Sequence, residues 1–268
     1  MSKSTNFGDG AGWFGQGGVA SAFGYAAGWL YQGANATAIG ATAGNANQGE
    51  YAVAVGHRAG FGNSTSGTNS VVDGGVGQGA WAVAVGANAG KLYQKPAAVA
   101  VGPNAGDITQ GENAVAVGNA AGFTNQGGDA VAIGVFSGKD KQGANSVAVG
   151  SNAGFTTQGG YAVSVGPDAG KTNQGFAAVA VGSVAGQTVQ GANSVAVGNA
   201  AGYSAQKDMC VAVGTNSGRN DQSQGAVAVG VSAGQTGQGA NSVAVGVSAG
   251  VTTQGSDAVS VGYLSGNS

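Results

Sequence analysis

The chain has 268 residues, of which 56 are glycine and only 7% are charged. Its formal net charge of −2 comes from 9 basic and 11 acidic residues, without the Lys/Arg cluster that nucleic-acid binding requires. The hydrophobic residues are mostly Ala and Val, which can fill only a thin interior. This composition excludes an average globular domain and predicts a slab or rod. The sequence also lacks the run of about 20 apolar residues that would predict a membrane span.

The N-terminal segment is unusually aromatic. Seven of the chain's aromatic residues (8 Phe, 3 Trp and 7 Tyr in total) lie between Phe7 and Tyr31. We predict that residues 1–32 form a thicker end that docks onto a partner, with a self-sealing aromatic plug as the alternative. Because no continuous apolar segment of the secretory type begins the chain, we expect synthesis in the cytoplasm of the producing cell. The candidate docking residues are Trp13, Phe14, Trp29 and Tyr31.

A 16-residue repeat runs through the chain. The consensus coil is G-x-x-A-G-x-T-x-Q-G-x-N-[AS]-V-A-V, and its first glycine recurs at this constant interval from Gly86 to Gly262. Short alternating strands punctuated by glycines indicate two strands and two turns per coil. Glycine at this density would melt packed helices. We therefore predict an all-β fold, a parallel β-solenoid (β-roll) of about sixteen coils spaced about 4.7–4.9 Å apart, with residues 33–268 as one regular array.

One interval breaks this spacing. The distance along the chain from Gly56 to Gly86 is two positions short of two full repeats, which we interpret as one regular coil and one shortened coil. On this interpretation the two missing positions lie near Ser64 to Ser70, and Ser70 takes the position of the glycine.

In each Val-Ala-Val strand the two valines share one face and the small residues share the other. We expect Val147 and Val149 to face the core against Ala153, which leaves Ala148 facing outward. A continuous uncharged stripe is unusual on a soluble monomer. We therefore predict a homo-oligomer with this stripe as its interface; an exposed Ala face without a partner is the alternative. The candidate interface residues are Ala84, Ala100, Ala116, Ala132, Ala148, Ala180, Ala196, Ala212, Ala228 and Ala244.

Equivalent residues of successive coils form columns. The Gln column, which runs from Gln16 to Gln254, is predicted to hydrogen-bond to itself or to turn backbones. In a second column, just after the G-x-x-A-G glycine, cations largely alternate with aromatic residues at a spacing that allows cation–π pairs. A glycan is the ligand we would expect for this surface ladder, and a tolerant surface turn is the alternative. The ladder residues are Phe123, Lys139, Phe155, Lys171, Tyr203 and Arg219.

Several apparent motifs carry no chemistry. Residues 166–172 resemble a phosphate loop but are one residue short, with Val165 where a glycine is required. His57 lacks a catalytic triad and is expected to be an exposed turn residue. Cys210 is expected to be a small packed residue, because no second cysteine is present for a disulfide. No Cys/His spacing predicts zinc, and we expect no enzymatic activity, cofactor or metal.

Three runs, Asn145 to Gly150, Asn193 to Gly198 and Asn241 to Gly246, read Asn-Ser-Val-Ala-Val-Gly. They resemble the head repeats of YadA-like trimeric autotransporter adhesins, and the resemblance covers almost the whole chain. It implies a left-handed β-roll, three of which pack into a trimer that binds surfaces. The coil here is longer than the family's usual coil, and the sequence contains no coiled-coil stalk or membrane anchor. In this respect it is similar to fibre or decoration proteins of phages and large DNA viruses.

We therefore expect a structural and adhesive element of a virion, with other virion or fibre proteins at its ends and a host-surface glycan as partners. A cell-surface or extracellular location reached by a non-classical route is the alternative. An ice-binding solenoid is the alternative function, because threonines form a partial column, interrupted by Ile108 and Asp140 among others. A carbohydrate-processing enzyme would need paired carboxylates on one face, whereas the acidic residues are scattered. The threonines are Thr124, Thr156, Thr172, Thr188, Thr236 and Thr252.

Overall fold

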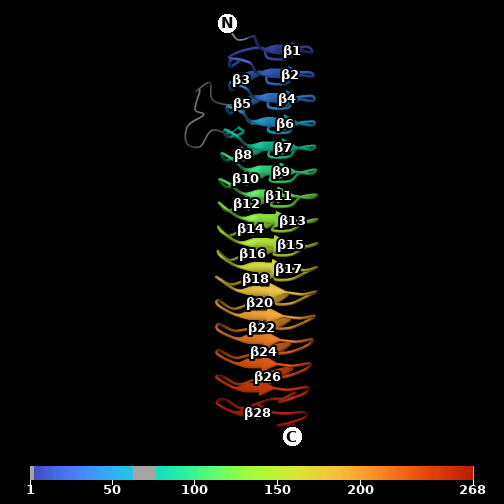
Figure 1. The fold of residues 1–268 in the computed structure, drawn as a ribbon, viewed down its shortest axis with the longest axis vertical. Coiled ribbons are helices and arrows are strands. Elements are labelled where there is room, and N and C mark those ends of the chain that lie inside the picture. Colours follow the sequence, from blue (N-terminus) through green and yellow to red (C-terminus); the bar gives the residue numbers. More distant parts are fainter. Residues whose placement is uncertain (1–2, 63–76, 268) are drawn as a thin grey trace. The chain divides into compact units, whose positions relative to one another are not determined.

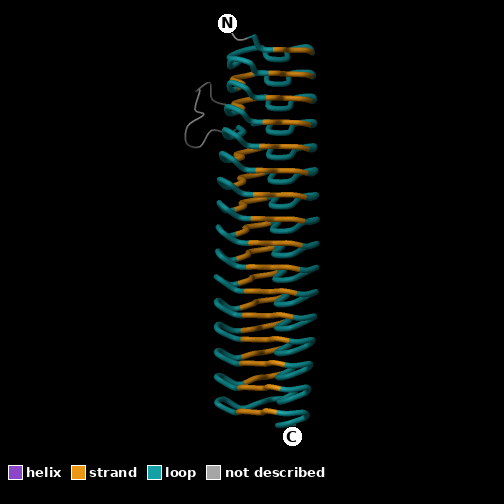
Figure 2. Tube along the Cα trace, in the orientation of Figure 1, coloured by secondary structure: helices purple, strands orange, loops and turns teal. Residues whose placement is uncertain are grey.

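The computed structural model describes residues 3–62 and 77–267. These residues are all-β, without a helix, and they form a parallel β-solenoid of about 15 turns of 16 residues (Figures 1 and 2). The predicted fold class is confirmed. The chain divides into two compact units, Met1–Lys141 and Gln142–Ser268. Within the described ranges, no helix has the length and apolar character needed to cross a membrane.

A regular coil contributes two short strands, one to each of two parallel sheets. In the first sheet, Val99 lies opposite Val115 and Ala100 opposite Ala116, which is the offset that the repeat predicts. In the first unit this sheet contains β1 (Thr5–Phe7), β2 (Ser21–Phe23), β4 (Thr37–Ile39), β6 (Val53–Val55), β7 (Val83–Val85), β9 (Val99–Val101), β11 (Val115–Val117) and β13 (Val131–Ile133). In the second unit it contains β15 (Val147–Val149), β17 (Val163–Val165), β19 (Val179–Val181), β21 (Val195–Val197), β23 (Val211–Val213), β25 (Val227–Val229), β27 (Val243–Val245) and β28 (Val259–Val261).

The second sheet is built from the T-x-Q segments, each ending at a glutamine. In the first unit, β3 (Leu30–Gln32) and β5 (Ala46–Gln48) pair as a separate two-stranded ladder, which isolated bridges of Gln78 with Gln48 and Gln94 connect to β8 (Leu92–Gln94), β10 (Ile108–Gln110) and β12 (Thr124–Gln126). Strand β14 (Asp140–Gln142) lies at the unit boundary. In the second unit the strands are β16 (Thr156–Gln158), β18 (Thr172–Gln174), β20 (Thr188–Gln190), β22 (Ser204–Gln206), β24 (Asn220–Gln222) and β26 (Thr236–Gln238).

The irregular interval is a single long coil. Strand β6 pairs directly with β7, with Val53 opposite Val83, and Gln48 forms a bridge with Gln78. The prediction of a separate shortened coil between these strands is therefore wrong. The solenoid has about 15 turns, in line with the prediction of about sixteen. The sequence arithmetic alone did not distinguish a short coil from an enlarged one. The proposed deletion near Ser64 to Ser70 falls outside the described residues.

Alanine and glutamine, rather than valine, fill the interior. Ala100 of β9 and Ala105 of the following turn are fully buried, whereas Val99 is partly exposed. The opposite wall is close: a Cβ placed on Gly106 would lie 3.4 Å from the Cβ of Ala100 and 2.7 Å from Oε1 of Gln110. A lumen this narrow has no room for valine next to the glutamine. The prediction that the valines face the core and the alanines face outward is therefore wrong.

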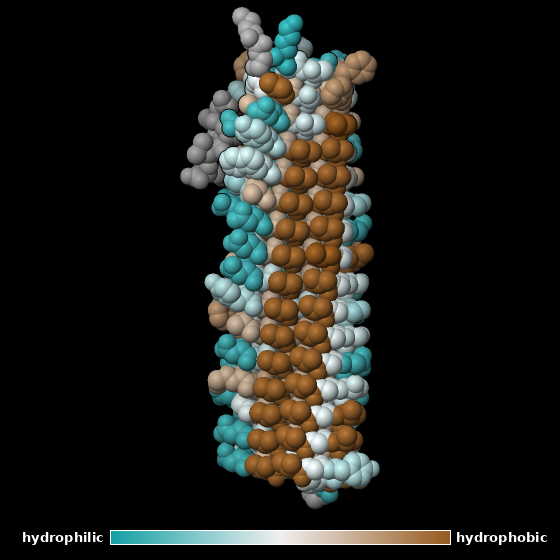
Figure 3. Space-filling view, in the orientation of Figure 1, coloured by the Kyte–Doolittle hydropathy of each residue, from teal (hydrophilic) through white to brown (hydrophobic). Residues whose placement is uncertain are grey.

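The same geometry removes the predicted interface. All ten candidate alanines are fully buried inside their own coils, so they cannot contact another chain. They are Ala84, Ala100, Ala116, Ala132, Ala148, Ala180, Ala196, Ala212, Ala228 and Ala244. The valines on either side of them point outward instead and form two adjacent apolar columns in each unit (Figure 3). We call these columns the valine stripe; it consists of the first and third residues of each first-sheet strand from β6 to β28, all of them valine except Ile133.

The predicted hydrogen bonding of the Gln column is confirmed. Nε2 of Gln94 donates to the carbonyl oxygen of Val83 (2.9 Å), to that of Ala98 (3.2 Å) and to Oε1 of Gln110 in the next coil (3.0 Å). The side chain therefore links the two sheets of its own coil and also joins neighbouring coils. Glutamines are the largest fully buried side chains of the described structure. They add a second hydrogen bond to backbone carbonyl groups such as that of Ala98, which also accepts from the N–H of Val83, and this gives the buried amide hydrogens their partners.

Glycine is required where the backbones of successive coils approach closely. Gly102 has a φ of +124°, and a Cβ at this position would lie 2.6 Å from the carbonyl oxygen of Gly118. Other left-handed positions are occupied by non-glycine residues, such as Asn88, Tyr93 and Ala97 in one coil, with φ between 56° and 57°. Asparagine tolerates this conformation better than most residues, which explains its frequency in the turns.

Candidate functional site

The aromatic residues near the N-terminus form two groups. Trp13 and Trp29 line one pocket, whereas Phe14 and Tyr31 pack edge to face with ring centroids 5.5 Å apart. Trp13 is 74% exposed and Trp29 is 40% exposed. These rings lie on the surface, and the interior beside them is filled by Ala22 and other buried alanines. The proposed docking role of all four residues stays a prediction.

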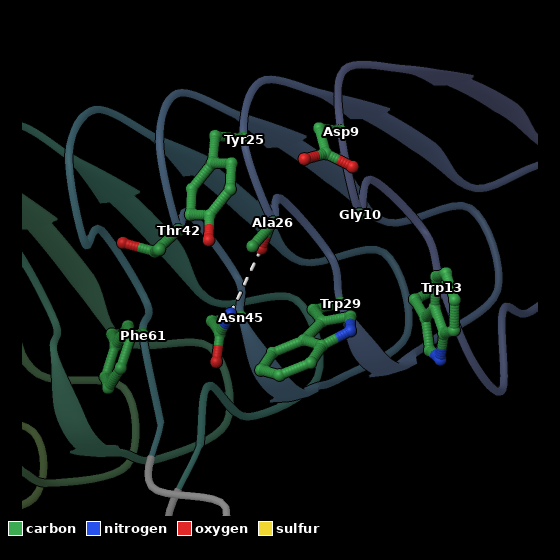
Figure 4. Close-up of a pocket in the computed structure, with 9 residues that line it drawn as sticks. All are labelled: Asp9, Gly10, Trp13, Tyr25, Ala26, Trp29, Thr42, Asn45 and Phe61. Atoms are coloured by element: carbon green, nitrogen blue, oxygen red, sulfur yellow. Dashed lines mark hydrogen bonds between the residues drawn. The ribbon is translucent and has the colours of Figure 1, made fainter.

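The pocket, which we call the aromatic cleft, has a volume of about 430 Å³ (Figure 4). It is formed by the G-x-x-A-G turns of the first coils. Equivalent positions of successive turns contribute to it, because the repeat stacks them one coil apart. Its lining residues are Asp9, Gly10, Trp13, Tyr25, Ala26, Trp29, Thr42, Asn45 and Phe61.

The cleft is hollow because two turn residues are small. Gly10 and Ala26 each stand three positions before a tryptophan of the cleft. In a later coil the same turn position holds Arg58, whose guanidinium carbon lies 4.7 Å from the centre of the Phe61 ring. An arginine side chain therefore fills the space beside Phe61 that stays open beside the tryptophans.

Polar side chains of the cleft are largely engaged with the backbone. Asn45 is only 5% exposed, and its Nδ2 donates to the carbonyl oxygen of Ala26 at 3.1 Å. The hydroxyl of Thr42 donates to the carbonyl oxygen of Ala41 at 2.8 Å. Figure 4 shows the carboxylate of Asp9 directed toward the hollow. The cleft thus offers aromatic surface with one charged group at its edge.

The surface ladder makes some of the contacts that its pattern predicts. Arg219 lies over the Tyr203 ring at 5.5 Å, a cation–π pair between successive coils. Lys139 instead lies 5.7 Å from Phe136 of its own turn, and Nζ of Lys171 forms an ion pair with Asp168 at 3.0 Å. Whether Phe123, Phe155 or the other ladder residues bind a glycan stays a prediction.

The ladder column extends further toward the N-terminus than the sequence interpretation recognised. Four residues of the first coils occupy the same repeat position as Phe123: Trp13, Trp29, Asn45 and Phe61. Counting back from Phe123 one coil at a time, with the long coil taken as one coil, leads to each of them. This spacing is visible in the sequence and could have identified the cleft residues. The hollow itself could not be foreseen, because it depends on where small turn residues lie relative to the rings.

An ion pair within this column contains a strongly buried carboxyl group. Asp107 is 5% exposed, and its Oδ1 lies 3.4 Å from Nζ of Lys91. Burial raises the pKa of the Asp107 carboxyl above its ordinary value, while the charges of Lys91 and Arg58 partly oppose the rise. The pair joins two turns of the first unit.

His57 and Cys210 have the surroundings that the sequence predicts. His57 is exposed in its turn. Cys210 is fully buried, its Sγ donates to the carbonyl oxygen of Ser223 at 3.0 Å, and burial raises the pKa of its thiol. In the part of the chain that the structure describes, no three His, Cys, Asp or Glu side chains are grouped in a way that could hold a metal ion.

The threonine column lies on the outer side of the second sheet. Thr188 and Thr236 are exposed, and Thr156 is partly exposed. The hydroxyl of Thr124 donates to Oδ1 of Asp140 at 2.8 Å. Asp140, which interrupts the threonine column, therefore hydrogen-bonds to the threonine of the preceding coil.

No protein-family model matches the chain, and no curated protein matches it in sequence.

Proposed function

We propose that the chain is a non-enzymatic structural and adhesive element whose copies associate through the valine stripe. The observation that carries this proposal is the continuous apolar surface that the outward-facing valines form in each unit. No residue of the stripe is charged. An extended apolar surface of this kind on a soluble protein marks an interaction site.

A second copy of the same chain is the partner that best fits this surface. The stripe repeats at the coil spacing of about 4.8 Å. Another copy presents the same spacing, so that valine methyl groups of the two surfaces interdigitate coil by coil within each unit. A partner with a different repeat loses this register after a few coils. The proposed interface is therefore formed by the valines of the first sheet. The alanines between them cannot form it, because they are buried.

The proposal includes a trimer of left-handed coils, by the resemblance to YadA-like heads. As a rod of a virion fibre or capsid decoration, the trimer docks onto other virion proteins by its ends and displays its turns to a host surface. Weak contacts repeated along the coils and across three subunits gain strength through avidity. The surface ladder and the aromatic cleft are the turn surfaces that support an adhesive role.

Light scattering coupled to size exclusion tests the association. We expect the wild-type protein to have about three times the chain mass of 25.2 kDa. The double variant Val163→Glu/Val179→Glu should have the mass of one chain, because it places two charges in the interface. Thr188→Glu, on the exposed side of the second sheet, is the matched control and should keep the wild-type mass. A wild-type protein that is monomeric at micromolar concentration contradicts the proposal.

Ice binding is the second candidate, supported by the outward-facing threonines Thr188 and Thr236. A thermal-hysteresis measurement separates the two functions. The structural and adhesive function predicts no hysteresis. Strong hysteresis that is lost on replacing both threonines with lysine would favour ice binding instead.

A further inference from the structure

We propose that the aromatic cleft binds a methylated ammonium group, the chemistry shared by choline, phosphocholine headgroups and trimethyl-lysine. The cleft lies on the turns and contains no residue of the valine stripe, so this inference is independent of self-association. It rests on three observations: the arrangement of the rings, the charge at the edge, and the occupancy of the same position in other coils.

The rings enclose the hollow from several sides. In Figure 4, Tyr25 lies on one side of the hollow, Trp29 on the opposite side and Trp13 beside it. The face of an aromatic ring carries negative electrostatic potential and attracts a cation within about 6 Å, most strongly when the ring is tryptophan. Two of the four aromatic residues that line the cleft are tryptophans, so the cleft is suited to a positively charged group.

The charge of the cleft has the sign that a cation requires. Among the nine lining residues, Asp9 is the one that carries a formal charge at pH 7. Its carboxylate is directed toward the hollow (Figure 4). The nearest basic group on the adjoining turn is Arg58, whose guanidinium is already stacked over Phe61 at the far end of the cleft.

The chain itself pairs a cation with an aromatic ring across the same two positions of other coils. Arg58 stacks on Phe61 in one turn, with the ring at the position of the tryptophans. In another turn the order is reversed, with Lys139 at the position of the tryptophans and the Phe136 ring three residues before it. In the first two coils the corresponding partner of each tryptophan is Gly10 or Ala26, neither of which has a charged side chain. Beside the tryptophans, a ligand cation would take the position that the Arg58 side chain takes beside Phe61.

The lining favours a cation without hydrogen-bond donors. An ammonium or guanidinium group of a protein partner would bring three to five N–H donors into the cleft. The hydroxyl of Thr42 and the side-chain amide of Asn45 each donate to a backbone carbonyl group. The oxygens of these two side chains and the Asp9 carboxylate can still accept, but much of the remaining lining is aromatic rings and small side chains without acceptors. An N–H donor directed at such a surface loses its hydrogen bond with water without replacing it, which is costly. A methylated ammonium has no donors, and the volume of about 430 Å³ leaves room for its substituent.

Calorimetric titration of the full-length chain with choline chloride at fixed ionic strength tests this inference. The uncharged isostere 3,3-dimethyl-1-butanol is the comparison ligand. We expect saturable choline binding and at least about 10-fold weaker binding of the isostere, equivalent to about 1.4 kcal/mol. Equal affinity for the two ligands, or no choline binding, overturns the proposal.

Variants identify the site. Trp29→Ala should weaken choline binding at least about 10-fold. Trp81→Ala, which removes an exposed tryptophan stacked on Tyr51 outside the cleft, is the matched control and should bind choline as the wild type does. Ala26→Arg reproduces the Arg58 arrangement and should abolish binding, whereas Ala26→Gln should not. Ala26 already has a φ of 49°, close to the 56° of Arg58, so the backbone accommodates arginine. Unchanged binding by Ala26→Arg contradicts the proposal.

Further arms separate the sources of the cation. Phosphatidylcholine vesicles, phosphatidylglycerol vesicles and a trimethyl-lysine peptide are compared for binding to the wild type and to Ala26→Arg. If the wild type binds the phosphatidylcholine vesicles or the peptide and Ala26→Arg does not, the result supports recognition of a methylated ammonium group. The ligand that the wild type binds more tightly then identifies the source of that group. Binding that Ala26→Arg leaves intact, or equal binding of both vesicle types, counts against this recognition.

Discussion

The hydroxyl of Ser164 donates a hydrogen bond to Oε1 of Gln174, with 2.7 Å between the oxygens. The same hydroxyl accepts from Nε2 of Gln158 at 3.2 Å. Ser164 is the middle residue of a first-sheet strand, where most coils have alanine. A serine that bonds to two buried glutamines shows directly that this face of the strand points inward. The glutamine column and the small strand residues therefore form one interior.

Replacing one glutamine of this column should destabilise the solenoid. Nε2 of Gln174 donates to the carbonyl oxygens of Val163 and Ala178 and to Oε1 of Gln190, at 2.9, 3.3 and 3.1 Å. Gln174→Leu removes these three bonds and the acceptor of the Ser164 hydroxyl, although the Ala178 carbonyl keeps its bond from the Val163 N–H and Ser164 keeps its bond from Gln158. We expect a loss of about 2–3 kcal/mol in unfolding free energy. Urea unfolding measures the loss, and an unchanged midpoint would show that the column does not stabilise the fold.

A glycine at a close approach between successive coils should not tolerate alanine. Gly182 has a φ of +126°, and an added Cβ would lie 2.6 Å from the carbonyl oxygen of Gly198. Gly182→Ala should lower the unfolding free energy by about 3 kcal/mol or more, because the backbone of a whole coil must shift. Gly255 has nothing within 4 Å of the corresponding position and is the control. Equal melting temperatures of Gly182→Ala and Gly255→Ala would contradict the close packing.

Exchanging two exposed residues of one column should change stability in opposite directions. Val189 and Asn173 occupy equivalent positions, with the same φ of 53°. This left-handed conformation is unfavourable for a β-branched residue and tolerated by asparagine. Val189→Asn should raise the unfolding free energy by about 0.5–1 kcal/mol, and Asn173→Val should lower it by a similar amount. Chemical denaturation checks both, and a shift of the same sign in the two variants would refute the explanation.

The buried Asp107 predicts a particular dependence of stability on pH. Because burial raises the pKa of this carboxyl in the folded state, the folded protein binds the proton more tightly than the unfolded chain does. The contribution of Asp107 to stability is therefore fully present below its unfolded pKa and is lost as the pH rises through the folded pKa. We expect Asp107→Asn to gain stability relative to the wild type as the pH increases from 3 to 7. The denaturant midpoints of the wild type and of Asp107→Asn, measured across this pH range, test this expectation. A stability of Asp107→Asn relative to the wild type that increases toward low pH would contradict the predicted direction.

The sequence predicted the parts of the fold that depend on periodicity alone. The constant repeat spacing was sufficient for the parallel coils, the glutamine column and the packed position of Cys210. It did not reveal which face of the strand points inward, because alternation shows only which residues share a face. The facing is decided by volume: the glutamine and the close turn glycines leave space for the methyl group of Ala100 but not for the side chain of Val99.

The candidate site was harder to foresee for a related reason. Trp13 and Trp29 were recognised as exceptional, but a docking surface was inferred from composition, without reference to their column. The cleft arises from Gly10 and Ala26, whose small size matters only once the turns are stacked. Likewise, the irregular interval could be divided in more than one way until the pairing of Val53 with Val83 was known.

The narrow interior of the solenoid and the valine stripe both follow from strand alanines that point inward and valines that point outward. Circular dichroism melting of Ala148→Glu and Val147→Glu, adjacent residues of β15, tests this arrangement. We expect Ala148→Glu to lose much of its β signal and melt at a clearly lower temperature, because it buries a charge in the lumen. Val147→Glu should keep the native spectrum. A stable, native-like Ala148→Glu together with an unfolded Val147→Glu would contradict the account.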